Sequence, residues 1–467
     1  MEQLKALFHE WAGEPCTECL ALGGGGSSRR YYRLVGATRS CIGTVATDVR
    51  ENEAFFAYTA HFAAKGIPVP QLYAVADDRC HYLQYDLGDQ TLYGILHEKK
   101  RQGGGFDAEM MAFYRQALAD LDAIQRAGRD LDFSHAYPRA AFDRRSMLWD
   151  LNYFKYYFLK LAHIPFDEEY LEDDFEKLVD FLLEADCSYF MYRDFQGRNI
   201  MVGNEGCKPQ LYYIDYQGGR RGAAQYDVAS LLYSAKSDLP EPLRQDLLRH
   251  YVDLHGDRRF MTHFWGYVLI RIMQAMGAYG YRGYYERKPY FLESIPLAVA
   301  NLRLVADGHP LPIRLPELGK VWQRIGEMQP AIAPATDGRL VVEVQSFSYK
   351  RGLPEDNSGN GGGFVFDCRA LPNPGRYEQY RVYTGKDRSV VEFLQREEAV
   401  AQFLDHAKGI AAQSIEKYLE RRFTHLSISF GCTGGQHRSV YCAEQLAAWI
   451  RDNYPEVIVD LHHRERE

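Results

Sequence analysis

Long apolar runs are absent from this 467-residue sequence. No segment approaches the ~18–20 consecutive apolar residues that a membrane-spanning helix needs. The segment Met1–His9 mixes charged and apolar residues with a helical period, which differs from the apolar core of a secretory signal. These absences predict a cytoplasmic protein without a membrane partner.

Positive charge is also scarce. Lysine and arginine number 55 against 63 aspartates and glutamates, so the formal net charge is −8. This balance argues against a generally basic nucleic-acid-binding protein. From Gly338 onward the corresponding counts are 17 and 18, so charge alone predicts no counterion-driven affinity for RNA in that part of the chain. Whether RNA is a partner stays open.

Regularly spaced cysteines are lacking as well. The nine cysteines do not form the pattern of a disulfide-rich secreted protein, which favours reduced thiols. Cys16 and Cys19 make a single C-x-x-C motif without a second pair or histidine partners. A metal or redox role for these two residues is therefore disfavoured.

The length and the apolar pattern predict more than one domain. Residues 1–90 contain short alternating runs, such as Tyr31–Val35 and Ile42–Ala46, and are expected to form a small β lobe. Residues 91–327 show mainly helical spacing and are expected to form a large helical lobe. Together they predict an α+β, protein-kinase-like bilobal fold.

A change of composition marks a second domain. Residues 328–339 are rich in proline and alanine and are predicted to be a linker. Residues 340–467 alternate strand and helix patterns, which predicts a smaller α/β domain. Helices are expected over Ser389–His406, Ala411–Glu420 and Val440–Asn453, and a buried strand is expected over Leu426–Phe430.

Three polar residues have the spacing of a phosphotransferase active site. Asn199 follows Asp194 by five residues, and the strand-like run Leu211–Ile214 leads directly to Asp215. In protein kinases one aspartate accepts the proton of the acceptor hydroxyl, while an asparagine and a second aspartate hold magnesium. The spacing therefore predicts ATP- and Mg²⁺-dependent phosphoryl transfer, with Asp194 as general base and Asn199 and Asp215 as metal ligands.

The glycine-rich segment that begins at Gly23 is the predicted nucleotide-binding loop. Glycines let the backbone approach phosphates, and hydroxyl and guanidinium groups can donate to them. The segment Ser40–Asp48 lacks the lysine that kinases use to hold phosphates, so an arginine of the loop is expected to replace it. Glu53 is left without a lysine partner, and a surface role and a catalytic role both stay open. The predicted contacts from the loop are Gly26, Ser27, Ser28, Arg29 and Arg30.

Asp227 begins an apolar helical run. It is interpreted as a carboxylate of the first helical turn, where it would stabilise the helix and brace the catalytic loop.

Residues 15–305 resemble the aminoglycoside phosphotransferase/choline kinase superfamily, most closely the bacterial kinases of N-acetylmuramate and N-acetylglucosamine. The matching segments are Ser27–Leu34, Gly66–Pro70, Tyr85–Asp89, Tyr192–Asn199 and Ile214–Gln217. The resemblance implies phosphorylation of the anomeric hydroxyl of a cell-wall amino sugar, and it adds Tyr85 to the nucleotide contacts.

The sequence departs from the superfamily at residue 192. Tyr192 stands where the superfamily usually has histidine, which puts the loop geometry in question. The acceptor is expected to contact the helical lobe, with ordinary surface packing as the alternative for the same side chains. The predicted acceptor-binding residues are Asp150, Asn152, Tyr153 and Arg198.

A second predicted site follows the strand Leu426–Phe430. The segment Gly431–Ser439 is a glycine-rich turn that leads into a helix, and free N–H groups at such a turn bind anions. The same run also fits the C-x₅-R-S loop of cysteine phosphatases. However, Gly431 replaces the histidine usual before the cysteine, and Asp367 is the one candidate acid. Anion binding without phosphatase chemistry is therefore favoured.

Residues 343–467 resemble the C-terminal domain of RapZ, a bacterial RNase adapter protein. The resemblance is carried by Phe347–Pro354, Phe366–Pro374, Tyr383–Asp387 and Gly431–Tyr441. Gln436 departs from the lysine common in that family, and the family's N-terminal P-loop ATPase half is absent. The resemblance implies binding of glucosamine 6-phosphate by Lys350, Asp367, Arg369, Asn373, Cys432, Thr433, Gly434, Gly435, His437, Arg438 and Ser439.

The sequence thus predicts an ATP-dependent kinase of a cell-wall amino sugar, joined to a domain that binds an amino-sugar phosphate effector. Two alternatives are a sensor protein whose kinase fold binds ATP without turnover, and a kinase of choline or an aminoglycoside. The exact sugar, the phosphorylated position and the formation of a homo-oligomer stay open.

Overall fold

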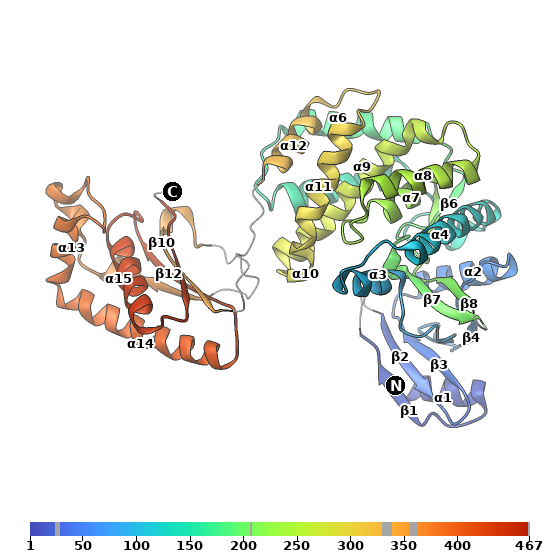
Figure 1. Ribbon diagram of the computed structural model, residues 1–467, viewed down its shortest axis with the longest axis horizontal. Coiled ribbons are helices and arrows are strands. Elements are labelled where there is room, and N and C mark those ends of the chain that lie inside the picture. The colour runs from blue at the N-terminus through green and yellow to red at the C-terminus, as the bar shows by residue number, and fades with distance from the viewer. Residues whose placement is uncertain (24–28, 206–207, 329–338, 355–362, 466–467) are drawn as a thin grey trace. The chain divides into compact units, whose positions relative to one another are not determined.

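The computed structural model describes residues 1–23, 29–205, 208–328, 339–354 and 363–465, and the chain divides into two compact units. One unit comprises Met1–Glu286 and Tyr290–Met328, and the other contains the described residues from Arg339 on (Figure 1). Of the predicted linker at 328–339, residues 329–338 lie outside the described part of the chain.

The small lobe of the first unit is built on an antiparallel sheet with strand order β1-β2-β3-β5-β4. Leu34, Cys41 and Leu83 point to one buried face, against helix α1 (Glu2–Ala12). Helix α2 (Val49–Ala64) begins at Asp48, whose side chain accepts from two backbone N–H groups of the first turn. The strands are β1 (Glu18–Ala21), β2 (Arg30–Val35), β3 (Ser40–Val45), β4 (Leu72–Val75) and β5 (His81–Gln84).

The large lobe is helical, with α9 (Phe260–Tyr279) buried along most of its length. This helix is apolar on nearly all sides, so it packs among α5, α7 and α11. The other helices are α3 (Leu92–Arg101), α4 (Ala108–Ala127), α5 (Arg144–Phe154), α6 (Glu168–Leu183), α7 (Gln225–Leu232), α8 (Glu241–His255), α10 (Pro289–Leu292), α11 (Ser294–Gly308) and α12 (Pro316–Glu327). The predicted bilobal α+β fold is confirmed.

Two short strand pairs interrupt the helices. Strand β6 (Tyr189–Met191) pairs with β9 (Arg220–Gly222), and β7 (Ile200–Glu205) pairs with β8 (Lys208–Tyr213), both antiparallel. The 3₁₀ turn Gly197–Asn199 lies between β6 and β7. These pairs frame the segment that carries the predicted catalytic residues.

The second unit has a four-stranded parallel sheet of order β11-β12-β10-β13. Its strands are β10 (Val341–Ser348), β11 (Phe364–Asp367), β12 (His425–Cys432) and β13 (Ile458–His463). Its helices are α13 (Arg388–Gln395), α14 (Glu398–Glu420) and α15 (Arg438–Asn453). The predicted α/β class is confirmed.

The predicted break between the helices Ser389–His406 and Ala411–Glu420 was wrong. The chain turns at Arg396 and Glu397, and α14 continues through Gly409 without interruption. A mid-helix glycine costs about 1 kcal/mol relative to alanine. The buried stripe of α14 outweighs this cost, because its residues repeat at helical spacing across the glycine: Val400, Leu404, Ala407, Ala411 and Ile415.

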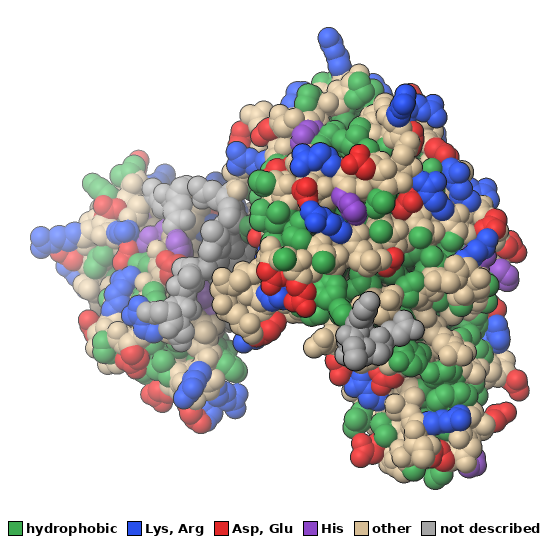
Figure 2. Space-filling view, turned by 45° about the vertical axis from the view of Figure 1, so that its right-hand side comes forward, with side chains coloured by type: hydrophobic (Ala, Val, Ile, Leu, Met, Phe, Trp, Pro, Cys, Tyr) green, Lys and Arg blue, Asp and Glu red, His purple; other side chains and the backbone are tan. Residues whose placement is uncertain are grey.

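No helix in the described part of the chain is both long and apolar enough to cross a membrane. The eight described cysteines are all free. On the face shown in Figure 2, basic and acidic side chains are interspersed over the surface.

Candidate active site

The β7–β8 hairpin brings the two predicted magnesium ligands together. Asn199 directly precedes β7, and Asp215 follows β8 by two residues. Because Ile200 pairs with Tyr213, the open ends of the hairpin are adjacent. The Asn199 Nδ2 atom lies 3.4 Å from Asp215 Oδ2 and donates a 2.8 Å hydrogen bond to the Asp194 carbonyl oxygen. All three predicted residues therefore meet at one place.

The atoms at this place fit a magnesium ion. Burial and the neighbouring Asp194 carboxylate raise the pKa of Asp215, and a bound cation would relieve both effects. The amide oxygen of Asn199 accepts no hydrogen bond from a described residue. Mg²⁺ prefers such hard oxygen ligands and takes phosphate oxygens or waters at its other positions.

Asp194 has a partly exposed side chain held by two donors. Gln196 Nε2 donates to its Oδ1 atom over 3.2 Å, and Arg271 Nη2 lies 3.4 Å from the same oxygen. No described residue engages the second oxygen, and 43% of the side chain is exposed. An exposed carboxylate with one free oxygen can accept a proton from a bound hydroxyl group.

Asp227 holds the backbone of the loop that carries Asp194. Its carboxylate accepts hydrogen bonds from the backbone N–H groups of Tyr192 (2.6 Å) and Arg193 (2.9 Å). Burial raises the pKa of Asp227 to about 7, against the opposing effect of these two donors. The Tyr192 hydroxyl donates to the carbonyl oxygen of Ile214, directly before Asp215. The bracing role predicted for Asp227 is confirmed, and Tyr192 ties the loop to the residue before Asp215, the predicted metal ligand.

A buried arginine of the small lobe pairs with a glutamate of α2. Arg29 is 4% exposed, and its Nη2 atom lies 3.4 Å from Glu51 Oε1 on α2. Burial acts to lower the pKa of Arg29, but the charges of neighbouring groups, Glu51 and Asp215 among them, raise it. Glu53 instead makes a surface ion pair with Arg79 at 2.5 Å, which favours its surface role over a catalytic one. Sequence reasoning missed Glu51, although it lies two positions before Glu53 in the first turn of the same helix.

The other residues predicted to contact the nucleotide are either outside the described part of the chain or exposed on the small lobe. Gly26, Ser27 and Ser28 lie outside the described residues. Arg30 is an exposed residue at the start of β2, and Tyr85 is 42% exposed just after β5.

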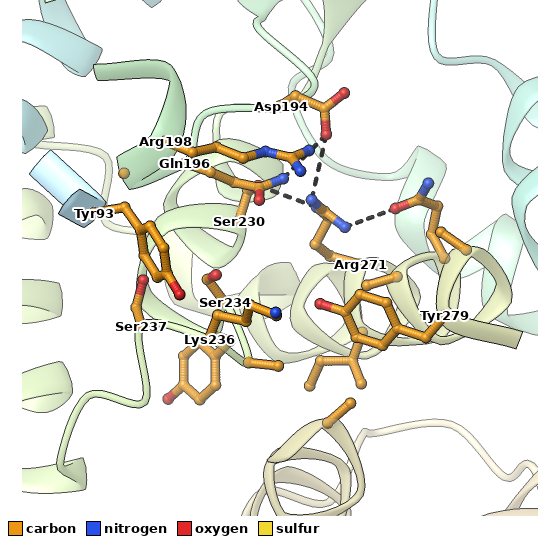
Figure 3. A pocket seen from close by; sticks show the side chains of 18 of the residues that line it. Tyr93, Asp194, Gln196, Arg198, Ser230, Ser234, Lys236, Ser237, Arg271 and Tyr279 are labelled. Atoms are coloured by element: carbon orange, nitrogen blue, oxygen red, sulfur yellow. Dashed lines mark hydrogen bonds and ion pairs between the residues drawn. The ribbon is translucent and has the colours of Figure 1, made fainter. Parts of the chain in front are cut away.

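A cavity of about 240 Å³ opens beside Asp194 (Figure 3). It is lined by the catalytic loop, the end of α7, the segment after it and one side of α9. Asp194, Arg198 and Arg271 converge in it, and the Lys236 side chain projects into the same space. The polar lining residues are Tyr93, Asp194, Gln196, Arg198, Ser230, Tyr233, Ser234, Lys236, Ser237, Arg271, Gln274, Tyr279 and Tyr290.

Of the four predicted acceptor residues, Arg198 alone lines this cavity. Asp150 is buried, and its two oxygens accept hydrogen bonds of 2.6 and 2.7 Å from Arg193. Asn152 donates to the Leu148 carbonyl oxygen of its own helix, and Tyr153 packs against Tyr157. The side chains of Asp150, Asn152 and Tyr153 thus make internal contacts, and none of the three lines the cavity.

Two cationic residues that line the cavity, Lys236 and Arg271, were not predicted from the sequence. Arg271 is a single arginine within the apolar helix α9, and an isolated charge in an apolar run is a signal for a buried polar site. Lys236 lies in a loop after α7, where nothing in the local pattern distinguishes it from a surface lysine.

The second predicted site gathers at the carboxyl edge of the parallel sheet. Ser348, Asp367 and Cys432 end β10, β11 and β12, and the register places Ser348 opposite Cys432. Ser348 Oγ donates to the Thr433 carbonyl oxygen, and Gly435 takes the left-handed conformation at φ 64°. The predicted strand, glycine turn and helix are confirmed. Ligands of open α/β sheets bind at this edge.

Several side chains predicted for this site are held by neighbours. Asp367 caps the following turn and pairs with Arg369 at 2.7 Å, and Arg369 stacks on Tyr349. Asn373 accepts from the Gly375 N–H group, and His437 interacts with the Tyr380 carbonyl oxygen at 2.9 Å. Lys350 and Gly434 are exposed beside the turn.

Hydrogen bonds from neighbouring groups hold both the Cys432 thiol and the Arg438 guanidinium. Burial would raise the pKa of the Cys432 thiol, but hydrogen bonds from Ser439 and from backbone N–H groups of the turn lower it. The Arg438 guanidinium, however, donates from Nη1 to the carbonyl oxygens of Arg369 and Leu371. The buried Arg438 Nε has no hydrogen-bond partner among the described residues, so the guanidinium keeps donors that a phosphate could engage, and the phosphatase alternative stays open.

Comparison with known families matches each unit separately. The sequence model described as "phosphotransferase enzyme family" matches residues 18–264, and that of the RapZ C-terminal domain matches residues 340–467. A nucleotide-binding protein of Marinobacter nauticus is 41% identical over 128 residues, which are 27% of this chain and 42% of that protein. One of Laribacter hongkongensis is 42% identical over 128 residues, covering 27% and 44%. The chain thus spans less than half the length of these curated relatives.

Solved structures resemble the chain at low sequence identity. An ethanolamine kinase of Plasmodium vivax is 10% identical, with a TM-score of 0.44, over 62% of this chain and 82% of that one. The aminoglycoside phosphotransferase APH(4)-Ia is 15% identical, with a TM-score of 0.42, over 65% and 97%.

Proposed function

Because the chain belongs to the phosphotransferase enzyme family, we propose that it transfers the γ-phosphoryl group of ATP to a hydroxyl group of a cell-wall amino sugar. The observation that carries the proposal is the meeting of Asp194, Asn199 and Asp215 at the edge of the cavity. The cavity size suits a small polar acceptor, since ligand sites are concave and of a few hundred Å³.

Each residue has a distinct part in the proposed reaction. Asp194 accepts the proton of the acceptor hydroxyl as its oxygen attacks phosphorus, and Gln196 and Arg271 hold the carboxylate in place. Asn199 and Asp215 hold Mg²⁺, which supplies charge neutralisation on the phosphate oxygens. Arg29, fixed by Glu51, contributes positive charge to the nucleotide phosphates. The Asp227 carboxylate keeps the loop in position.

The test of this proposal is ATP turnover by the full-length protein with Mg²⁺ and a panel of acceptors. The panel compares, in parallel and at equal concentration, N-acetylmuramate, N-acetylglucosamine, glucosamine, choline and kanamycin. We expect turnover with the N-acetylated sugars and little with choline or kanamycin. Turnover with choline or kanamycin alone would contradict the sugar assignment. ATP binding without turnover on any acceptor would favour a sensor protein.

We also propose that the second unit binds an amino-sugar phosphate at the turn between β12 and α15. The backbone N–H groups of a turn before a helix favour anions, and the Gly434 side of the turn is exposed. Glucosamine 6-phosphate is expected to bind the full-length protein more tightly than glucosamine does, by calorimetry. Gly434→Asp, which adds a negative charge to the turn, should lower that affinity at least tenfold, with Gly409→Asp on α14 as the matched control. An unchanged affinity in Gly434→Asp would contradict this site.

The effector is further proposed to regulate the kinase. Saturating glucosamine 6-phosphate should change kcat or KM of the sugar kinase reaction. Unchanged values of both constants would contradict the regulatory link while leaving the kinase assignment intact.

A further inference from the structure

The charges that line the cavity beside Asp194 are mostly positive. Arg198, Lys236 and Arg271 line it together with one carboxylate, that of Asp194. Arg271 is 7% exposed and is already engaged with Asp194, Ser230 and Gln274. Arg198 and Lys236 make no hydrogen bond or ion pair with a described residue. The cavity therefore holds two cationic groups that are available to a ligand.

Lys236 is the more informative of these cations, because it is partly withdrawn from solvent. Its ammonium group lies over the ring of Tyr290, and burial lowers its pKa to about 8. The charge of Glu293 opposes this shift in pKa, and the charge of Arg198 adds to it. A partly desolvated ammonium beside an arginine is costly when the cavity is empty, and an anion bound between the two would relieve that cost.

The position of Lys236 separates it from the expected nucleotide phosphates. Arg29, Asn199 and Asp215 are the groups proposed to serve those phosphates, and none of the three lines the cavity. Figure 3 shows Lys236 beside Ser234, on the side of the cavity away from Asp194. A group that contacts Lys236 therefore belongs to the acceptor molecule, away from its reacting hydroxyl.

Uncharged parts of the lining suit a sugar ring. Tyr93, Tyr279 and Tyr290 contribute aromatic surface with polar hydroxyl groups, and Ser234 and Ser237 contribute donors and acceptors. The cavity thus combines ring-sized aromatic walls with a cationic end.

We propose that the acceptor carries an anionic substituent, a carboxylate or a phosphate, which Lys236 and Arg198 bind, and that the cavity disfavours cationic acceptors. The proposal rests on the proposed kinase function and narrows its substrate class. Like charges brought together in a recognition site repel each other, which acts against amino-rich acceptors such as kanamycin.

A matched pair of sugars tests this proposal. N-acetylmuramate and N-acetylglucosamine differ by one lactyl group with its carboxylate, and N-acetylglucosamine 6-phosphate supplies the phosphate arm. We expect kcat/KM for at least one anionic sugar to exceed that for N-acetylglucosamine about tenfold or more. The arm that shows the preference identifies the source of the charge. Equal values for all three sugars would overturn the proposal while leaving the kinase function standing.

Variants of Lys236 assign the preference to this side chain. Lys236→Met should reduce the anionic-to-neutral ratio of kcat/KM about tenfold, and Lys236→Arg should retain most of it. Lys65→Met, which removes an exposed lysine at the end of α2, is the matched control and should leave the ratio unchanged. An unaltered ratio in Lys236→Met would overturn the role of this residue.

Binding supplies a readout that does not require turnover. Calorimetric titration of the same sugars into full-length protein with Mg²⁺ and AMP-PNP should show tighter binding of the preferred anionic sugar, and Lys236→Met should remove that advantage. Absence of turnover together with this preference would contradict the kinase function and support the anion site. Tighter binding of N-acetylglucosamine or glucosamine than of both anionic sugars would overturn the anion site.

Discussion

Asp194→Asn is expected to lower kcat of the proposed kinase by ~10²–10⁴ while leaving ATP affinity nearly unchanged. The amide nitrogen of asparagine cannot accept the proton of the acceptor hydroxyl, but asparagine has almost the same size and retains a polar contact with Gln196. Asn199 bonds to the backbone of residue 194, not to its side chain, so the metal site should persist. Steady-state turnover and equilibrium binding of Mg²⁺–ATP measure the two effects separately.

The control for this experiment is Asp253→Asn, which makes the same chemical change at an exposed position of α8. It should have wild-type turnover. A less than tenfold loss in Asp194→Asn would exclude Asp194 as the general base. A parallel loss of ATP binding would mean that the carboxylate serves the nucleotide site instead.

Asp150→Ala is expected to lower the free energy of unfolding of the first unit by about 3–5 kcal/mol. Its carboxylate binds the buried guanidinium of Arg193 through two hydrogen bonds, and alanine would leave that cation without its charge partner. Arg193 precedes Asp194 and has a left-handed backbone at φ 85°, so loss of the pair also loosens the catalytic loop. Differential scanning calorimetry of the full chain should show a lower Tm for the transition of the first unit.

A double variant separates charge from packing. Asp150→Leu combined with Arg193→Met removes both charges, and it should be less destabilised than Asp150→Ala because no unpaired cation remains buried. In this double variant the Tyr226 hydroxyl would lose the hydrogen bond that it accepts from Arg193, and it would need a new partner. A change below 1 kcal/mol in Asp150→Ala, together with a raised KM for the acceptor, would restore the acceptor role predicted from the sequence.

The spacing of local motifs predicted much of the two sites. Asp194, Asn199 and Asp215 could be identified from the sequence because two strands joined by a short turn must bring their outer ends together. The turn at Gly431–Ser439 could be identified for the same kind of reason, since a strand, a glycine turn and a helix follow one another directly. In both cases neighbouring elements define the geometry.

Contacts between distant segments were not encoded in such patterns. Arg29 meets Glu51 across 22 residues of chain, and Arg271 reaches Asp194 across 77 residues. Asp150 could equally have faced a ligand, and the packing of α5 beside the catalytic loop decided that it binds Arg193. Side-chain partners of this kind depend on how elements pack in three dimensions.

The sequence alone determined the bilobal class, the α/β class of the second unit, and the type and order of the residues at both sites. The tertiary structure decided which charges surround those residues, and hence that the cavity beside Asp194 is lined by three cations and one carboxylate. The physical reason is that hydrophobic periodicity and turn residues act over a few positions, whereas the electrostatic character of a cavity arises from segments far apart in the chain.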